Sequence, residues 1–502
     1  MKKRIAVIVL LAALAAMGSS GCSRKKPAAV SPSQTVTEPS GELTEAEETT
    51  IEPFDLTTEA PEQTETLETL EPSEISEPSD APGTAGAQGK IGDGTHTGTD
   101  GRNNRLIIAS DLHYLAEELT DGGEAFTYMV EHGDGKLANY VWEITDAFIG
   151  EVIEAQPQAL ILSGDLSLNG EKRSHEELAA KLSEIEDAGI PVVVIPGNHD
   201  INNPKAAAFK EAEHYPAETA SPEDFVNIYY DFGYSEALSR DEHSLSYTYQ
   251  LDDFNRLLML DSCQYDQGVA LVGGMIKLET YSWIEEQLAA AWDEGMNVIP
   301  VSHHNLMDES QVYVDDCTIE HSEELMQKLC DWKVPWYLSG HLHVQHFKSS
   351  EDYGIDEIVT SSLSTAPCQY GVIEYWDDGS FSYVTKAVDV AAWARKAGGK
   401  DKNLLEFPEY ARTMLERVFY NKVMDTYKNS TIPPARLVKM AKLYAKLNVY
   451  SYAGKAVDIV SEVTENPDYG LWEEYGSDSI LYQYMEEIVR DAVQDYNAFV
   501  RD

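Results

Sequence analysis

The chain has 502 residues, more than one compact core usually holds, and it carries a formal net charge of −50. So acidic a chain is repelled by nucleic acid, and we therefore exclude a nucleic acid polymer as its partner. Any anionic substrate would need a local reversal of charge, which bound metal cations can supply.

The first 22 residues have the pattern of a secretory signal. Lys2, Lys3 and Arg4 precede an apolar run from Ile5 to Met17, which is shorter than the ~20 residues of a membrane-spanning helix. The run ends in small residues before Cys22, which resembles a bacterial lipoprotein signal with Cys22 as the lipidated residue. We expect an extracytoplasmic, cell-surface lipoprotein that meets the bacterial membrane only through this anchor. A cleaved signal and a secreted protein are the alternative.

Residues 23–102 are rich in Thr, Glu, Pro and Ser and contain few large apolar side chains. Such a segment cannot bury enough apolar surface to offset its chain entropy. We therefore predict a disordered acidic linker, whose Gly-rich end at 83–101 marks the boundary of the folded part.

From Arg105 onward, short apolar strands alternate with amphipathic helices, which predicts a parallel sheet core. Residues 201–244 are expected to form a helical insertion over one edge of that core. Further strands are expected near residues 356–361, 371–376 and 381–386, where they would close the sheet in antiparallel fashion. The other expected strands cover 106–109, 159–162, 192–195, 246–250, 256–261, 298–301 and 336–338, and the helices cover 136–156, 174–188, 280–293 and 322–331.

These elements form one predicted domain over residues 103–395, and the pattern changes after it. Residues 400–502 show almost no strand signal and three helical runs. One lies near 409–428, the second follows Pro433-Pro434, and the third follows a Ser/Asp capping cluster at 477–479. We expect an all-helical C-terminal domain with a packing or dimerisation role.

Polar residues follow directly on five of the predicted strands. Because open α/β sheets place their sites at the carboxyl ends of strands, these residues are expected to converge. Each motif is weak by itself, and the joint occurrence is the strong signal. The residues are Asp111, His113, Asp165, Asn198, His199, Asp200, His303, His341 and His343.

This ordered set resembles the calcineurin-like metallophosphoesterase superfamily over about residues 105–390. The motifs are Asp111-x-His113, Gly164-Asp165, Gly197-Asn198-His199-Asp200, His303 and Gly340-His341-x-His343. The resemblance implies a mixed α/β fold with a sandwich of two sheets flanked by helices. The helical C-terminal domain makes the layout most similar to secreted or anchored bacterial cyclic nucleotide phosphodiesterases.

The resemblance also implies two divalent or trivalent metal ions. Imidazole and carboxylate ligands without thiolates suit Fe, Mn or Zn. By resemblance, one ion takes Asp111, His113 and His343, the other takes Asn198, His303 and His341, and Asp165 bridges the two. His304 follows His303 directly and is an alternative ligand.

His199 is left free of metal in this scheme. We expect it to act as the general acid while a hydroxide formed from the bridging water attacks the phosphate. Its alternative role is to hydrogen-bond the phosphate. Many relatives orient this His with an Asp three residues after the bridging Asp, but that position is Leu168 here, and Asp200 is the candidate partner. His175 and His346 are expected at the surface, and His346 is near enough to the site to line it.

The expected substrate is a small phosphorylated molecule, most plainly a cyclic nucleotide or a related small phosphodiester. The alternatives are a phosphomonoesterase, or a hydrolase of nucleotide sugars or cell-wall phosphodiesters. A hypothesis of a different class is a surface binding module in which the metal ions are structural.

Overall fold

The computed structural model describes residues 104–265, 270–312 and 316–501. The predicted signal, Cys22 and the linker at 23–102 lie outside the described residues. The described residues belong to one compact unit. In the described part of the chain, we find no helix that is both long and apolar enough to cross a membrane.

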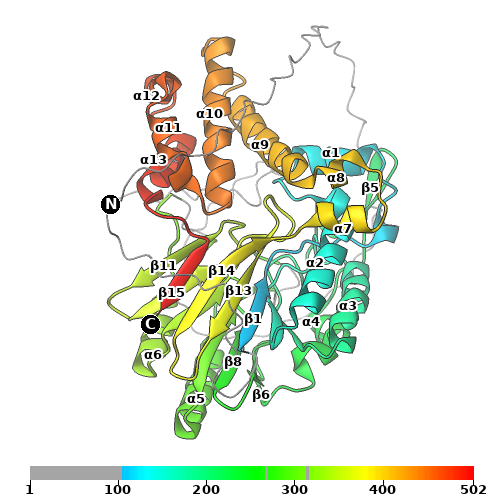
Figure 1. The fold of residues 1–502 in the computed structure, drawn as a ribbon, viewed down its shortest axis with the longest axis vertical. Helices are drawn as coiled ribbons and strands as arrows, with labels where there is room; N and C mark the ends of the chain where they lie inside the picture. Colours follow the sequence, from blue (N-terminus) through cyan, green and yellow to red (C-terminus); the bar gives the residue numbers. More distant parts are fainter. Residues whose placement is uncertain (1–103, 266–269, 313–315, 502) are drawn as a thin grey trace, which may run out of the picture. The chain divides into compact units, whose positions relative to one another are not determined.

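The apolar runs of the sequence form two sheets (Figure 1). The first has the strand order β15-β14-β13-β1-β2-β3, and the second has the order β11-β12-β10-β9-β8-β7-β6. The strands of the first sheet are β1 (Arg105–Ala109), β2 (Ala159–Leu162), β3 (Val192–Val194), β13 (Gln369–Tyr375), β14 (Phe381–Ala387) and β15 (Ala498–Arg501). Those of the second are β6 (Ser239–Arg240), β7 (Tyr247–Gln250), β8 (Asn255–Leu260), β9 (Asn297–Ser302), β10 (Trp336–Ser339), β11 (His346–Ser350) and β12 (Ile355–Val359).

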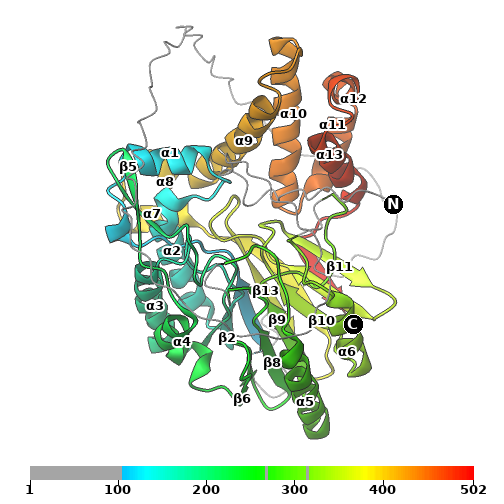
Figure 2. The same ribbon diagram turned by 180° about the vertical axis from the view of Figure 1, so that it is seen from behind.

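Alternation along β8 shows how the layers are built. Leu257 and Met259 lie in the core cluster shared with β1. Leu258 and Leu260 lie in a second cluster with the helices α5 (Leu278–Glu294) and α6 (Ser322–Asp331). The second sheet therefore packs against the first sheet on one face and against α5 and α6 on the other (Figure 2). Helices α2 (Val141–Ala155) and α3 (Lys172–Asp187) pack on the first sheet (Figure 1).

The four expected helices of the catalytic region are present as α2 (Val141–Ala155), α3 (Lys172–Asp187), α5 (Leu278–Glu294) and α6 (Ser322–Asp331). The region also contains α1 (Glu124–His132) and α7 (Val390–Lys396), which were not expected, and α4 (Pro222–Ile228) within the segment 201–244. The later helices are α8 (Lys402–Leu405), α9 (Phe407–Thr426), α10 (Pro434–Tyr452), α11 (Val460–Thr464), α12 (Gly470–Tyr475) and α13 (Ile480–Asp491). The Ser479 hydroxyl caps α13 by accepting from the Tyr482 N–H at 3.2 Å, as the sequence predicts.

The expectation of a helical insertion at 201–244 is wrong. The segment forms a hairpin of β4 (Ala207–Lys210) and β5 (Glu213–Pro216), then the short helix α4, an irregular turn and β6. Prolines interrupt any longer helix, because proline lacks the N–H that a helix interior requires. Pro222 instead opens α4, where Ser221 forms a capping box with Asp224.

Two expectations about strands also need correction. β12 pairs parallel with β10, and its antiparallel neighbour is β11, which the sequence pattern did not indicate. The C-terminal region is not all helical, because its last strand β15 pairs antiparallel with β14 of the catalytic sheet. Phe499 of β15 packs on Phe347 and Phe381, which explains why so short a segment joins the sheet.

Candidate metal centre

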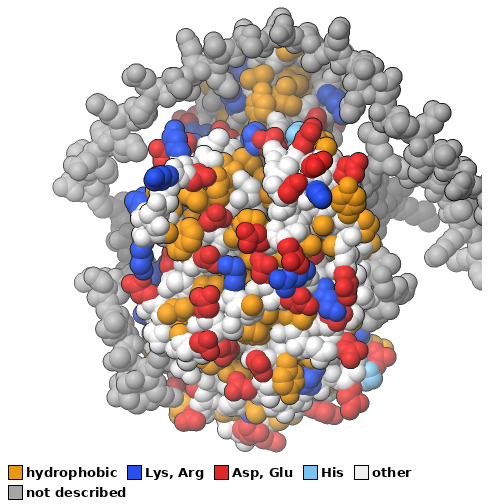
Figure 3. All heavy atoms as spheres, turned by 90° about the vertical axis from the view of Figure 1, so that its right-hand side faces the viewer, with side chains coloured by type: hydrophobic (Ala, Val, Ile, Leu, Met, Phe, Trp, Pro, Cys, Tyr) orange, Lys and Arg blue, Asp and Glu red, His pale blue; other side chains and the backbone are white. Residues whose placement is uncertain are grey.

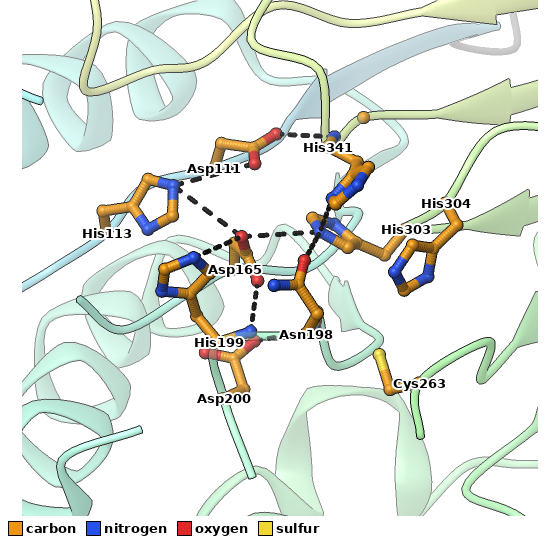
Figure 4. Close-up of polar contacts among 12 residues, drawn as sticks. Asp111, His113, Asp165, Asn198, His199, Asp200, Cys263, His303, His304 and His341 are labelled. Carbon is orange, nitrogen blue, oxygen red and sulfur yellow. Dashed lines mark hydrogen bonds and ion pairs between the residues drawn. The ribbon is translucent and has the colours of Figure 1, made fainter. Parts of the chain in front are cut away.

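Loops at the carboxyl ends of β1, β2, β3, β9 and β10 bring the predicted residues together (Figure 4). Within each sheet these strands run parallel, so their carboxyl ends lie along one edge. His199 is partly exposed and its neighbours are buried. The buried residues are Asp111, His113, Asp165, Asn198, His303, His341 and His343.

One group of side chains surrounds His113 Nε2. This nitrogen lies 3.0 Å from His343 Nε2, 3.7 Å from Asp111 Oδ1 and 3.7 Å from Asp165 Oδ2. His343 Nε2 is itself 3.2 Å from Asp111 Oδ1. The geometry therefore offers two imidazole nitrogens and two carboxylate oxygens to one point.

A second group surrounds His303 Nε2. This nitrogen lies 3.1 Å from Asn198 Oδ1, 3.2 Å from His341 Nδ1 and 3.4 Å from Asp165 Oδ2. Asp165 Oδ2 therefore belongs to both groups. The other oxygen of that carboxylate accepts the His199 backbone N–H at 2.8 Å, which fixes how Asp165 faces the cluster.

The chemistry of these groups fits metal ions. Acceptor lone pairs converge here, and such an arrangement is costly in a buried site without a cation between them. Asp111 Oδ1 and the Nδ1 atoms of His113 and His343 have no hydrogen-bond partner among the described residues. Three overlapping sets of the Asp and His side chains could each hold an ion, with ligand atoms within 4.8 Å of one another.

The backbone of the loops is strained at the cluster. Five of its side chains stand on residues with a left-handed φ, a conformation that residues other than glycine rarely adopt. These are Asp111 (55°), His113 (46°), Asp165 (50°), His341 (73°) and His343 (59°). Hydrogen bonds between loops hold this geometry, including His113 N–H to Asp165 O at 2.9 Å and His341 N–H to Asp111 Oδ2 at 3.0 Å.

Close contacts between neighbouring loops explain why glycine stands at two positions of the motifs. A Cβ on Gly197 would lie 2.2 Å from both the backbone nitrogen and the Oδ1 atom of Asp165. A Cβ on Gly340 would lie 1.9 Å from the Ser110 hydroxyl. These positions therefore need glycine so that neighbouring loops can touch.

The structure distinguishes the two adjacent histidines. His303 bonds the Ser163 carbonyl through Nδ1 at 2.9 Å, which leaves Nε2 facing the cluster. His304 bonds Ser262 Oγ through Nδ1 at 2.8 Å and the Val272 carbonyl through Nε2 at 2.8 Å. Both ring nitrogens of His304 are used outside the cluster, so His303 is the residue available to a metal.

The prediction that Asp200 orients His199 is wrong. His199 Nδ1 lies 2.7 Å from the Leu168 carbonyl and 3.1 Å from Asn169 Oδ1, so these two groups orient the ring. The Asp200 carboxylate is fully buried and accepts backbone N–H groups of neighbouring loops. They are Leu166 (3.1 Å), Ser167 (2.9 Å) and Gly197 (2.8 Å). Asp200 therefore stabilises, by hydrogen bonds, the loops that carry Asp165 and Asn198.

Two histidines expected at the surface have structural roles instead. His175 is fully buried and contacts the Tyr229 hydroxyl at 3.0 Å and the Asp200 carbonyl at 3.0 Å. His346 lies between the carboxylates of Glu309 and Asp491, with Nε2 2.9 Å from the latter. Both sit in helical or strand positions whose burial depends on contacts distant in sequence.

Burial and charge shift the pKa values at the cluster. Burial raises the pKa of Asp165, but His303 and His199 outweigh it and hold the pKa well below its usual range. Burial and the positive charge of Lys136 lower the pKa of His199 to about 4. No motif pointed to Lys136, because a single basic residue after Gly135 is a weak sequence signal.

A two-sheet sandwich with such a cluster at its strand ends is the architecture of a metal-dependent hydrolase of phosphate esters. Residues 104–345 match the family model of the calcineurin-like phosphoesterases. Residues 389–495 match the C-terminal domain of cyclic nucleotide phosphodiesterase. No curated protein sequence matches the chain.

The solved structures to which the chain is similar are distant in sequence. A dimetal phosphatase from Danio rerio is 13% identical, with 57% of this chain and 96% of that chain covered and a TM-score of 0.43. GAP50, the anchor in the inner membrane complex of Plasmodium, is 11% identical, with 57% and 88% covered and a TM-score of 0.32. The sulfate thiohydrolase SoxB from Thermus thermophilus is 13% identical, with 66% and 62% covered and a TM-score of 0.32.

Proposed function

We propose that the chain is a binuclear-metal phosphodiesterase. The observation that carries the proposal is the position of Asp165 Oδ2, which belongs to both ligand groups and so suits a carboxylate that bridges two ions. In this assignment His113, His343 and Asp111 hold one Fe, Mn or Zn ion. Asn198, His303 and His341 hold the other.

Metal ions of this kind lower the pKa of a water between them and withdraw negative charge from phosphate oxygens. The protein supplies the proton for the leaving group. Since a carbonyl only accepts, Nδ1–H of His199 donates to Leu168 and leaves Nε2 facing Asp165 Oδ2 at 3.9 Å. From that position a protonated Nε2 can donate to the leaving alkoxide, and an anionic phosphate beside the ring favours the protonated form.

The proposed substrate class is a cyclic nucleotide or a related small phosphodiester. The match of residues 389–495 to the C-terminal domain of cyclic nucleotide phosphodiesterase supports this choice. The metal ligands alone do not discriminate, because phosphomonoesterases and nucleotide-sugar hydrolases use the same donor types. The walls of the site decide the substrate.

A panel of substrates tests the proposal. The chain is loaded with Mn²⁺ and given bis-p-nitrophenyl phosphate, p-nitrophenyl phosphate, 3′,5′- and 2′,3′-cyclic nucleotides and UDP-sugars. We expect turnover of diesters, with at least one cyclic nucleotide cleaved faster than the monoester. Faster monoester cleavage would contradict the phosphodiesterase assignment. Binding of two ions without turnover of any compound would contradict the proposal that the chain is an enzyme.

We also propose that Cys22 anchors the protein by a lipid on the outer side of the bacterial membrane. The pattern of residues 1–22 supports this placement. Cys22→Ser should move the protein from the membrane fraction to the soluble fraction and prevent incorporation of labelled palmitate. Unchanged fractionation and labelling would contradict the anchor.

A further inference from the structure

A fully buried carboxyl group stands in β12, a strand that carries none of the cluster residues. It belongs to Glu357, whose Oε1 accepts the Leu306 N–H at 2.7 Å and whose Oε2 accepts the Met307 N–H at 2.7 Å. Burial of a carboxyl group is costly unless hydrogen bonds replace the lost water. Here two neighbouring backbone groups of one loop provide those bonds, so Glu357 and this loop fix each other in place.

The loop that Glu357 holds is the one that carries His303. Strand β9 ends at Ser302, so His303 is the first residue after the strand, and Leu306 follows three residues later. A backbone N–H can only donate, so both oxygens of the Glu357 carboxyl group are needed to satisfy the two buried N–H groups. The side chain of Glu357 therefore decides where the loop at 303–307 lies.

A second set of hydrogen bonds joins Glu357 to the loop at 340–345, which follows β10. The hydroxyl of Ser339, the last residue of β10, donates to Glu357 Oε1 at 2.7 Å and accepts from Asn305 Nδ2 at 3.0 Å. Asn305 Nδ2 also donates to the Gly340 carbonyl at 3.2 Å, and the Gly340 N–H donates to the His303 carbonyl at 3.0 Å. Glu357 therefore belongs to a network that ties the two loops to each other.

Both loops carry ligands of the same proposed ion. His303 and His341 belong to the group that surrounds His303 Nε2, and this nitrogen lies 3.2 Å from His341 Nδ1 (Figure 4). We call the ion assigned to this group the second ion. The group of the first ion takes two of its three ligands from the loop after β1, a strand of the other sheet. A change at Glu357 should therefore affect the second ion more than the first.

We propose that Glu357 is a positioning residue for the second ion and that it fixes the loops of His303 and His341 relative to each other. The inference rests on the proposed binuclear function. The side-chain hydrogen bonds of Glu357 go to the backbone after His303 and to Ser339 rather than to either histidine. A binding site has to be held within about 0.5 Å of its productive geometry, so a shift of either loop should weaken the second ion.

The first test is Glu357→Gln in the full chain, titrated with Mn²⁺ by calorimetry. An amide has one acceptor oxygen where the carboxyl group has two, so one of the two loop N–H groups loses its partner. The wild type should bind two ions. Glu357→Gln should keep the affinity of one ion and weaken the other about 10- to 100-fold.

Two further variants identify the ion that is weakened. His113→Ala removes a ligand of the first ion, and His341→Ala removes a ligand of the second. Adding Glu357→Gln to His113→Ala should weaken the ion that remains, whereas adding it to His341→Ala should have no further effect. A general loss of stability would not produce this difference.

Asp252→Asn is the matched control. The Asp252 carboxylate also accepts two backbone N–H groups, those of Phe254 and Asn255 at 2.8 Å each. It lies in the turn before β8, and because β8 and β9 run parallel, this turn is at the end of the sheet opposite the cluster. Asp252→Asn should lower the temperature of thermal unfolding and leave both ions bound with wild-type affinity.

Ser339→Ala provides a second, milder variant with less risk to folding. It removes only the hydroxyl that joins Glu357 to Asn305, and it should weaken the same ion several-fold. Wild-type affinity for both ions in Glu357→Gln and Ser339→Ala, or equal weakening of the two ions, would overturn the proposal. A wild type that binds two ions but hydrolyses no ester would instead overturn the proposed function, because metal binding is measured without turnover.

Discussion

Five residues of the cluster combine burial, a left-handed backbone and acceptor atoms that converge. A left-handed φ costs of order 1–3 kcal/mol at a residue other than glycine, so such a set persists only where surrounding contacts hold it. Here inter-loop hydrogen bonds and glycine contacts provide that support. The strain keeps the side chains pointed at the cluster before any ion binds.

At the scale of single residues, we predict that Gly197→Ala disrupts the metal centre. Its Cβ would press on the backbone nitrogen and carboxylate of Asp165, so we expect a loss of about 1–3 kcal/mol in the free energy of unfolding and weaker metal binding. Thermal unfolding with and without Mn²⁺ measures both. Gly150→Ala, in the open face of α2, is the control and should be neutral or slightly stabilising. Equal effects of the two changes would contradict the prediction.

We predict that His199→Ala lowers kcat about 10²- to 10⁴-fold and leaves metal content unchanged. The physical reason is that His199 Nε2 faces the cluster, whereas Nδ1 is held by Leu168 and Asn169. Steady-state kinetics and metal analysis on the same samples provide the measurement. Loss of an ion from the variant would show that the ring is a ligand and that its assignment as the acid is wrong.

Strands with a continuous apolar run were predictable from the sequence, and those without one were not. β1, β2 and β3 consist of residues such as Ile107, Leu160 and Val193 that are buried on both faces, so composition alone indicates them. β11 and β15 are short edge strands with polar positions, and pairing with distant partners decides whether they form.

The same distinction holds for the site. Its ligand candidates follow apolar strands and were predictable, because strand ends fix where they lie. The role of Asp200 was not predictable, since two of its three backbone partners, Leu166 and Ser167, lie 34 and 33 residues away in sequence. Lys136 was missed because a single basic residue forms no motif in the sequence.

At the scale of elements, His346 joins β11 and α13 in a pH-dependent contact. Burial lowers its pKa, but Glu309 and Asp491 outweigh burial and raise the pKa to about 10. Because the folded-state value lies above the unfolded value of ~6.5, the stabilisation is complete below ~6.5 and is lost as pH rises through about 10.

We therefore predict that the contribution of His346 to stability falls between these limits by at most about 1.4 kcal/mol per pH unit. The measurement is urea unfolding of the wild type and of His346→Gln from pH 6 to 10.5. The difference between the two should shrink as pH rises. His214→Gln, on the exposed strand β5, should show no such trend. A constant difference for His346→Gln would contradict the prediction.

Across the whole molecule, the catalytic and C-terminal regions are joined in more than one place. β15 completes the first sheet, α9 packs on the turn at Gly135, and Asp491 pairs with His346. One face of the molecule carries acidic side chains across its area with basic side chains among them (Figure 3). A phosphate must approach an acidic protein, so the positive charge that bound metal ions would supply is central to the proposed function.

The most direct test of that account is the metal content and diesterase activity of the wild type and of Asp165→Asn. After loading with Mn²⁺, the wild type should bind two ions per chain and hydrolyse bis-p-nitrophenyl phosphate. Asp165→Asn should retain at most one tightly bound ion and lose more than about 100-fold in rate, because its amide cannot bridge as a carboxylate does. Two tightly bound ions and a wild-type rate in Asp165→Asn would contradict the account.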